Sequence, residues 1–99
     1  MEYSSFLPVG TVVELKNAKR KLVIIGIFQL DLENEVVYDY VGVLYPEGYI
    51  GSNSCFLFNK EDIKNIVYQG YDDDDRKGYI SMMDTALQQV NEVLSSDEE

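Results

Sequence analysis

The side chains most often used in catalysis are scarce in this sequence. It contains no histidine and a single cysteine, Cys55. A Ser-His or Cys-His nucleophilic pair therefore cannot form, and a metal site with histidine ligands cannot form either. A lone cysteine also allows no intrachain disulfide, which fits a reducing compartment. Carboxylates are what remains for chemistry, since the chain has 18 acidic residues.

The four consecutive carboxylates of Asp72–Asp75 could in principle bind calcium. A calcium loop of the EF-hand kind spaces its ligands at alternate positions, with glycine at the sixth position and glutamate at the twelfth. Counted from Asp72, those positions hold Lys77 and Met83. We therefore predict a solvated helix start here and no metal site.

Asp39 and Glu47 could in principle form the acid and base pair of a glycosidase. Asp39 lies between apolar neighbours in a strand-like run, where an unpaired buried charge is costly. The sequence therefore favours a structural hydrogen bond or an ion pair at Asp39. We predict no catalytic residue, no cofactor and no enzymatic activity, and a small enzyme that uses carboxylates alone is the alternative.

Five runs rich in β-branched and aromatic residues predict strands. The run Leu22–Leu30 is almost continuously apolar, which is typical of a central strand. Gly26 within it indicates a bulge, a bend or a close approach of another backbone. Asn59 is a good N-cap for one helical turn before the last strand. The predicted strands cover residues 11–16, 22–30, 36–45, 55–58 and 63–68.

A helical period follows the acidic run, from about Asp75 to Leu94. Apolar side chains recur there on one stripe, which is typical of an amphipathic helix. These are Tyr79, Met83, Ala86, Leu87, Val90 and Leu94. The acidic residues at its start suit the positive end of the helix dipole.

These elements predict an α+β fold in one domain over residues 1–99. Its parts are a β-rich segment (6–70), a C-terminal helix (72–94) and a flexible tail (95–99). The β-rich part is expected to be a strongly bent antiparallel sheet. An open sheet and a small SH3-like barrel are both compatible with the pattern.

The formal net charge of −10 limits the choice of partner. Binding to nucleic acid or to an anionic membrane surface depends on lysine and arginine, so we predict neither and expect a protein partner. The N-terminus lacks the features of a signal peptide, and the longest apolar run has only seven residues, Leu22–Phe28. The sequence therefore predicts a cytoplasmic protein.

Two sets of side chains are candidates for partner binding. The chain has eight tyrosines, and tyrosine provides amphipathic contact area at low entropic cost. Ordinary strand tyrosines would look the same. Met82 and Met83 belong either to a helix face that packs on the sheet or to a docking surface for a partner helix. The candidate partner-binding residues are Tyr38, Tyr40, Tyr45, Tyr49, Met82 and Met83.

Three segments resemble a family of small uncharacterised proteins of Gram-positive bacteria. They are Phe6–Val13, Tyr38–Gly48 and Phe58–Ile63, and the likeness extends over about residues 6–80. Members of that family are encoded beside Leu-X-Gly polymorphic toxins and genes of type VII secretion. The resemblance implies an accessory protein of toxin export, acting as a chaperone or targeting adaptor. It carries over no functional residue.

An alternative is an immunity protein that blocks the active site of a cognate toxin. A strongly acidic surface would suit a basic nuclease toxin. Protection of cells by co-expression distinguishes the two hypotheses. The sequence indicates neither the binding face nor the oligomeric state.

Overall fold

The computed structural model describes residues 6–97, with side chains described as far as Ala86. The chain divides into two compact units, one formed by residues 6–71 and one that contains the C-terminal segment from Asp72. We call them the β unit and the helix unit.

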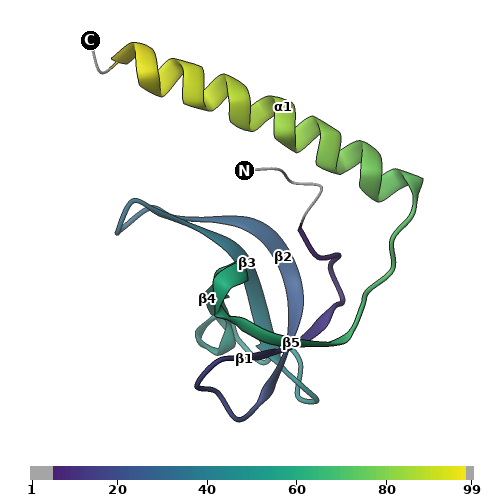
Figure 1. Cartoon of the computed structure of the whole chain (residues 1–99). Helices are drawn as coiled ribbons and strands as arrows, with labels where there is room; N and C mark the ends of the chain where they lie inside the picture. Colours follow the sequence, from purple (N-terminus) through teal and green to yellow (C-terminus); the bar gives the residue numbers. More distant parts are fainter. Residues whose placement is uncertain (1–5, 98–99) are drawn as a thin grey trace. The chain divides into compact units, whose positions relative to one another are not determined.

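The β unit is a five-stranded antiparallel sheet with the strand order β4-β3-β2-β1-β5 (Figure 1). The central position of β2 confirms the prediction made from its apolar run. Two 3-10 turns, η2 and η3, flank β4. The elements are β1 (Val12–Leu15), β2 (Lys21–Asp31), β3 (Val36–Leu44), η2 (Ser52–Ser54), β4 (Phe56–Phe58), η3 (Lys60–Asp62) and β5 (Ile63–Tyr68).

One face of the sheet carries most of the buried side chains, because paired residues on neighbouring strands point to the same face. Tyr40 is the largest fully buried side chain. Its ring lies 5.5 Å from the ring of Phe6 and 5.5 Å from that of Phe58, measured between centroids. The Tyr40 hydroxyl accepts a hydrogen bond from the backbone N–H of Leu7 at 2.9 Å, so the polar end of this side chain is satisfied. The other buried apolar residues of the unit are Val13, Leu22, Ile24 and Val43.

The long strands β2 and β3 curve together, and a bulge marks the bend (Figure 1). The register shifts between Ile24 and Gly26, so Ile25 is an extra residue on β2. A Cβ atom added to Gly26 would lie 2.9 Å from the Val41 Cγ1 atom. The bulge predicted at Gly26 is therefore present, and the close neighbours of this glycine are the side chains of Val41 and Gln29 and not another backbone.

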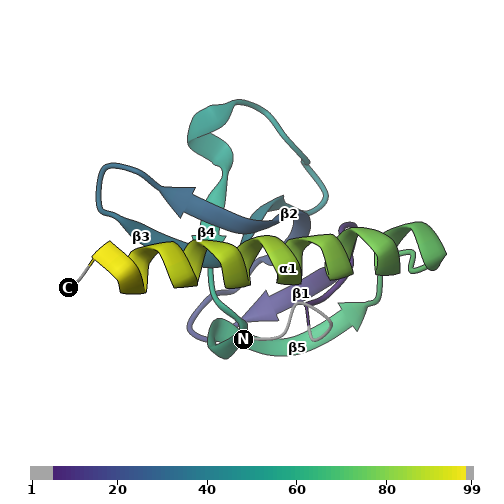
Figure 2. The same cartoon turned by 90° about the horizontal axis from the view of Figure 1, so that it is seen from above.

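The sheet is open, with β4 and β5 at its two edges. The α+β class is confirmed, and of the two alternatives for the sheet it is the open one that the structure contains. Figure 2 shows the connection from β3 to β4, which carries η2, arching away from the strands. The predicted helical turn at residues 59–62 is η3, where the Asn59 N–H donates to an Asp62 carboxylate oxygen at 2.9 Å.

The described part of the helix unit contains one helix, α1 (Asp74–Asp97). It begins inside the predicted segment 72–94, one residue before the helical period expected from about Asp75, and runs three residues past the predicted end at Leu94. Residues 95–97, predicted as tail, are therefore helical, while Glu98 and Glu99 lie outside the described residues. Within residues 6–97, no helix has the length and apolar character that crossing a membrane requires.

Candidate partner-binding surfaces

The four candidate tyrosines do not form one surface. Tyr38 and Tyr40 point to one face of β3, whereas Tyr45 follows the opposite face by alternation. Tyr40 is completely buried, so its side chain belongs to the core and is not accessible for binding. Tyr38 is half-buried, while Tyr45 and Tyr49 are exposed.

Asp39 has the structural role that the sequence favoured. Its side chain is 8% exposed, and its Oδ2 atom accepts a hydrogen bond from the backbone N–H of Lys60 at 2.8 Å. The backbone N–H of Asp39 in turn donates to Asn59 Oδ1 at 3.0 Å. These two bonds tie β3 to the start of η3, across about 20 residues of sequence. The buried carboxylate therefore organises a turn, and the predicted structural hydrogen bond is confirmed.

Lys60 lies beside the same turn with its ammonium group 4.0 Å from the centroid of the Phe6 ring. This contact is a cation–π interaction. Burial lowers the pKa of Lys60 from its ordinary value of 10.5, and the negative charge of Asp39 opposes that shift. The partly desolvated ammonium group is thus stabilised by an aromatic ring and a carboxylate within the β unit.

A hollow of about 330 Å³ opens on the sheet face opposite the main core. Val12 pairs with Val23 on β2 and with Tyr68 on β5, which places Tyr68 and Val12 on one face. Lys21 lies two residues before Val23 and shares that face. We call this hollow the tyrosine pocket; its lining residues are Val12, Lys21, Tyr45, Val67 and Tyr68.

A bulge in β5 brings two neighbouring residues to the tyrosine pocket. Val12 pairs with Tyr68 but Val13 pairs with Ile66, so Val67 is an extra residue on β5. In a regular strand, adjacent side chains point to opposite faces. Because a bulge re-aims the side chain of the extra residue, Val67 and Tyr68 both line the pocket.

The second tyrosine of the pocket is positioned by an arginine. The backbone N–H of Tyr45 donates to the carbonyl of Lys21 at 3.0 Å, and the Arg20 Nη2 atom donates to the carbonyl of Tyr45 at 3.1 Å. The same guanidinium forms an ion pair with Glu47. The hydrogen bond from Arg20 holds the pKa of Glu47 below its ordinary value of 4.5. Arg20 therefore fixes the turn that carries one wall of the pocket.

The end of the β2–β3 hairpin exposes apolar side chains among acidic ones. We call residues 30–37 the hairpin end; its exposed apolar residues are Leu30, Leu32, Val36 and Val37. Leu30 and Val37 are direct partners across the hairpin. Asp31 Oδ1 accepts hydrogen bonds from the backbone N–H groups of Glu33 at 3.1 Å and Asn34 at 3.3 Å, and the Asn34 side chain donates to Asp31 Oδ2 at 2.9 Å. These bonds lower the pKa of Asp31 and hold the turn, with the contribution of the Asn34 side chain the largest.

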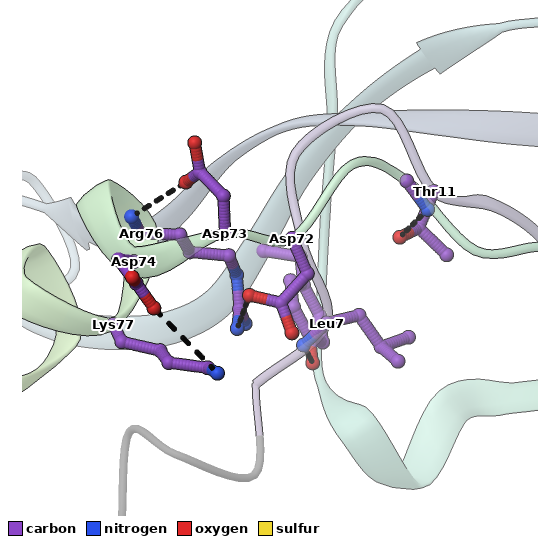
Figure 3. A network of polar contacts seen from close by, with 9 residues as sticks. Leu7, Thr11, Asp72, Asp73, Asp74, Arg76 and Lys77 are labelled. Carbon is purple, nitrogen blue, oxygen red and sulfur yellow. Dashed lines mark hydrogen bonds and ion pairs between the residues drawn. The ribbon is translucent and has the colours of Figure 1, made fainter.

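The start of α1 uses its acidic residues as a cap and in ion pairs (Figure 3). Asp73 Oδ1 accepts a hydrogen bond from the backbone N–H of Arg76 at 3.0 Å, which is the geometry of an N-cap. The Arg76 guanidinium lies 3.3 Å from Asp72, and Lys77 lies 4.0 Å from Asp74. Within the described residues, no group of three or more His, Cys, Asp or Glu side chains is placed to hold a metal ion.

The two candidate methionines differ in exposure. Met82 is 60% exposed, and Tyr79 is also exposed one turn earlier on α1. Met83 is half-buried. Met82 and Tyr79 are i, i+3 neighbours, so they present adjoining apolar area on the helix surface.

A family model described as domain of unknown function DUF4176 matches residues 6–78. The chain belongs to this family. No curated protein and no solved structure matches it. The DUF4176 match covers the whole β unit and the first turn of α1, and therefore includes the tyrosine pocket, the hairpin end and the helix cap.

Two residues that line the tyrosine pocket, Lys21 and Tyr68, were not among the binding candidates predicted from the sequence. Tyr68 follows two β-branched residues at the end of the last strand, and Lys21 ends the only cluster of three basic residues, Lys19–Lys21. Neither signal indicates that the two side chains line the same hollow. That depends on the pairing of β1 with both β2 and β5, and on the bulge at Val67.

Proposed function

We propose that this protein is a non-enzymatic accessory protein of type VII toxin export. It binds a cognate Leu-X-Gly toxin or another secretion component in the cytoplasm, as a chaperone or targeting adaptor. The resemblance of Tyr38–Gly48 and its flanking segments to proteins encoded beside such toxins supports the export setting. Membership of DUF4176 is compatible with this setting and adds no activity of its own.

The hairpin end is the observation on which the binding role depends. Leu32 is 78% exposed, and the three other apolar residues of this segment are also exposed. Leu30 and Val37 pair across the hairpin on one face, whereas Val36 pairs with Asp31 on the other. Exposed apolar surface among polar residues is typical of a protein-binding site, and Asp31, Glu33 and Glu35 are the acidic residues of this segment. A partner with an apolar surface bordered by lysine or arginine is the complementary match.

The helix unit supports the same role through a second surface. Residues 72–99 carry nine acidic and two basic side chains. Tyr79 and Met82 provide exposed apolar area on this acidic helix. Methionine adapts to irregular partners because its side chain is unbranched and polarizable.

The position of Asp39 supports a non-enzymatic role. Asp39 is an acidic residue between apolar neighbours of a strand, and a catalytic role would require its carboxylate to face a substrate. Its Oδ2 atom is instead engaged by the Lys60 backbone N–H, and the side chain is nearly buried. The Asp39 carboxylate therefore holds a turn, which supports a structural role for this residue.

Co-purification tests the proposal. We expect the tagged protein to recover the toxin encoded beside its gene from the same cells, and we expect Leu32→Ser to reduce the recovery several-fold. Leu57→Ser is the matched control, since Leu57 is also an exposed leucine but lies on β4. Equal recovery with both variants would move the site away from the hairpin end, and repeated recovery of no partner would contradict the binding role.

Protection from the toxin separates the export role from an immunity role. Co-expression with the toxin's catalytic domain should leave cells unprotected if the protein acts in export. Rescue of those cells, with binding confined to the catalytic domain, would favour the immunity hypothesis.

A further inference from the structure

The apolar side chains of α1 divide into a buried set and an exposed set. Ile80 is 5% exposed and Met83 is half-buried. Tyr79 and Met82 are 47% and 60% exposed, and Ala86, about one turn after Met82, is exposed as well. At about 100° per residue, Tyr79, Met82 and Ala86 lie within about 60° of one another around the helix axis. They form one row along the helix, which we call the exposed row.

The spacing of the exposed row fits a second helix. Residues at i, i+3 and i+7 form one apolar stripe of a helix, and two helices pack by fitting the side chains of such stripes together. The backbone of a helix is already hydrogen-bonded along its length, so this surface offers nothing with which an extended strand could pair. A methionine at the centre of the row adapts to the side chains of a partner.

Asp75 gives the exposed row a negative charge at one end. It lies one turn before the first residue of the row, in the i, i+4 relation, and is exposed. Within the described residues, no hydrogen bond or ion pair engages its carboxylate. The next two residues are cations, and each is paired with another acid of this turn (Figure 3). The pairs are Arg76 with Asp72 and Lys77 with Asp74. A lysine or arginine of a partner is therefore the complement of Asp75.

The charge of the C-terminal segment decides between a second copy and a different protein. Residues 72–99 hold nine acidic and two basic side chains. Two copies of α1 side by side would place this excess of negative charge against itself, and like charges across a helix interface oppose pairing. A helix with a basic border meets no such repulsion.

We propose that the exposed row of α1 docks onto an amphipathic helix of a partner protein, whose apolar stripe is bordered by lysine or arginine. Met82 is the central anchor between Tyr79 and Ala86, and Asp75 pairs with a basic residue of the partner helix. This inference rests on the proposed partner-binding role and names a second contact, separate from the hairpin end.

A selection with the purified full-length protein tests the contact without any toxin. The probe is a displayed library of helical peptides, in which one stripe is varied among apolar residues and the flanking positions among Lys, Arg, Asp and Glu. We expect binders with Lys or Arg at the flanking positions, and we expect their binding to weaken as the salt concentration rises. Hydrogen exchange of the α1 amides should slow in the complexes.

Met82→Glu identifies the anchor. It should weaken the selected peptides about tenfold or more, because it places a charge in the apolar contact. Ser81→Glu is the matched control, since Ser81 is also exposed but lies about 100° away around the helix. Circular dichroism should show the same helix content in both variants. A loss of binding with Met82→Glu alone supports the exposed row as the docking surface.

Charge reversal identifies the polar contact. Asp75→Lys should weaken the selected peptides, and a new selection on this variant should yield peptides with Asp or Glu at the flanking positions. Asp74→Lys is the matched control, because it makes the same charge change in the same turn at a residue that faces Lys77. We expect peptides selected on the wild-type protein to bind Asp74→Lys nearly unchanged.

Four results would overturn the proposal. They are a selection without a specific binder, binders without an excess of Lys and Arg, an equal loss with Met82→Glu and Ser81→Glu, and an equal loss with the two lysine variants. Self-association that Met82→Glu abolishes would show that a second copy covers the row. A large loss of folding stability in Met82→Glu would show that the row is covered within the protein itself. The proposed function fails separately, since it depends on recovery of the toxin from cells.

Discussion

Thr11 and Gly70 meet where the start of β1 comes close to the segment after β5. The Thr11 hydroxyl is fully buried and accepts a hydrogen bond from the backbone N–H of Gly70 at 3.0 Å. A Cβ atom added to Gly70 would lie 2.5 Å from the carbonyl oxygen of Val9, which is closer than real contacts allow. Gly70 therefore allows two backbone segments to approach so closely that a larger residue at this position would require one of them to shift.

Gly70→Ala should destabilise the β unit by about 1–3 kcal/mol, as overpacking of a tight site does. Gly78, which lies in the first turns of α1, is the matched control, because a Cβ atom added there would meet nothing within 4 Å. Gly78→Ala should instead stabilise the helix by up to about 1 kcal/mol. Urea denaturation followed by tyrosine fluorescence and by circular dichroism checks both, and an unchanged midpoint for Gly70→Ala would contradict the close approach.

The pKa of Glu47 should depend on Arg20. The hydrogen bond from Arg20 is the main cause of the lowered pKa, followed by a backbone hydrogen bond. A carboxyl group whose pKa is lower in the folded state stabilises the fold at pH values above its unfolded-state pKa, which is about 4.5 for Glu47. This stabilisation is lost as the pH falls through the folded-state pKa. We expect Arg20→Ala to raise the Glu47 pKa toward 4.5 in a carboxyl NMR titration.

Lys19→Ala is the control for that titration, since it also removes one positive charge from the β1–β2 turn. If both variants raise the Glu47 pKa equally, the overall positive charge of the turn lowers this pKa, and the hydrogen bond from Arg20 is not the cause.

At the scale of elements, α1 depends on its cap. Asp73→Ala should cost the helix about 1 kcal/mol, because the Arg76 N–H loses its acceptor. Asp73→Ser should restore most of this, since serine is also a good N-cap. Hydrogen exchange at the Arg76 amide is the measurement: we expect it to speed up in the alanine variant and to slow again in the serine variant. Equal rates in all three proteins would show that Asp73 does not cap α1.

The strands and the helix could be predicted to within a few residues because their signals are local. Alternating or continuous β-branched runs and an apolar helical stripe identified β1 to β5 and α1. The bulge at Ile25 followed from Gly26, where a Cβ atom has no room. The bulge at Val67 has no glycine and depends on how β1 and β5 pair, so no local pattern indicates it.

Local sequence patterns do not distinguish residues whose role depends on long-range packing. Tyr40 has the same sequence character as Tyr45, yet Tyr40 is the centre of an aromatic cluster and Tyr45 is a pocket wall. Alternation places these residues on opposite faces of β3, but only the sheet order decides which face is the core. For Asp39, in contrast, the cost of burying a charge was sufficient to predict a structural hydrogen bond.

At the scale of the whole molecule, the chain carries its exposed apolar groups at separate places. The hairpin end is framed by acidic residues, the tyrosine pocket by Lys21, and α1 presents Tyr79 and Met82 on an acidic helix. The units that carry them are distinct, and the β unit is nearly neutral in comparison with the C-terminal segment. Exposed apolar groups at separate places are compatible with the adaptor role proposed above.

The decisive measurement is export of the proposed partner, a Leu-X-Gly toxin, in cells with and without the gene for this chain. We expect deletion to reduce the secreted toxin strongly while the cells stay viable, and we expect the wild-type protein, but not Leu32→Ser, to restore secretion. Unchanged secretion after deletion, with no toxin bound to the purified protein, would contradict a role as an export accessory protein.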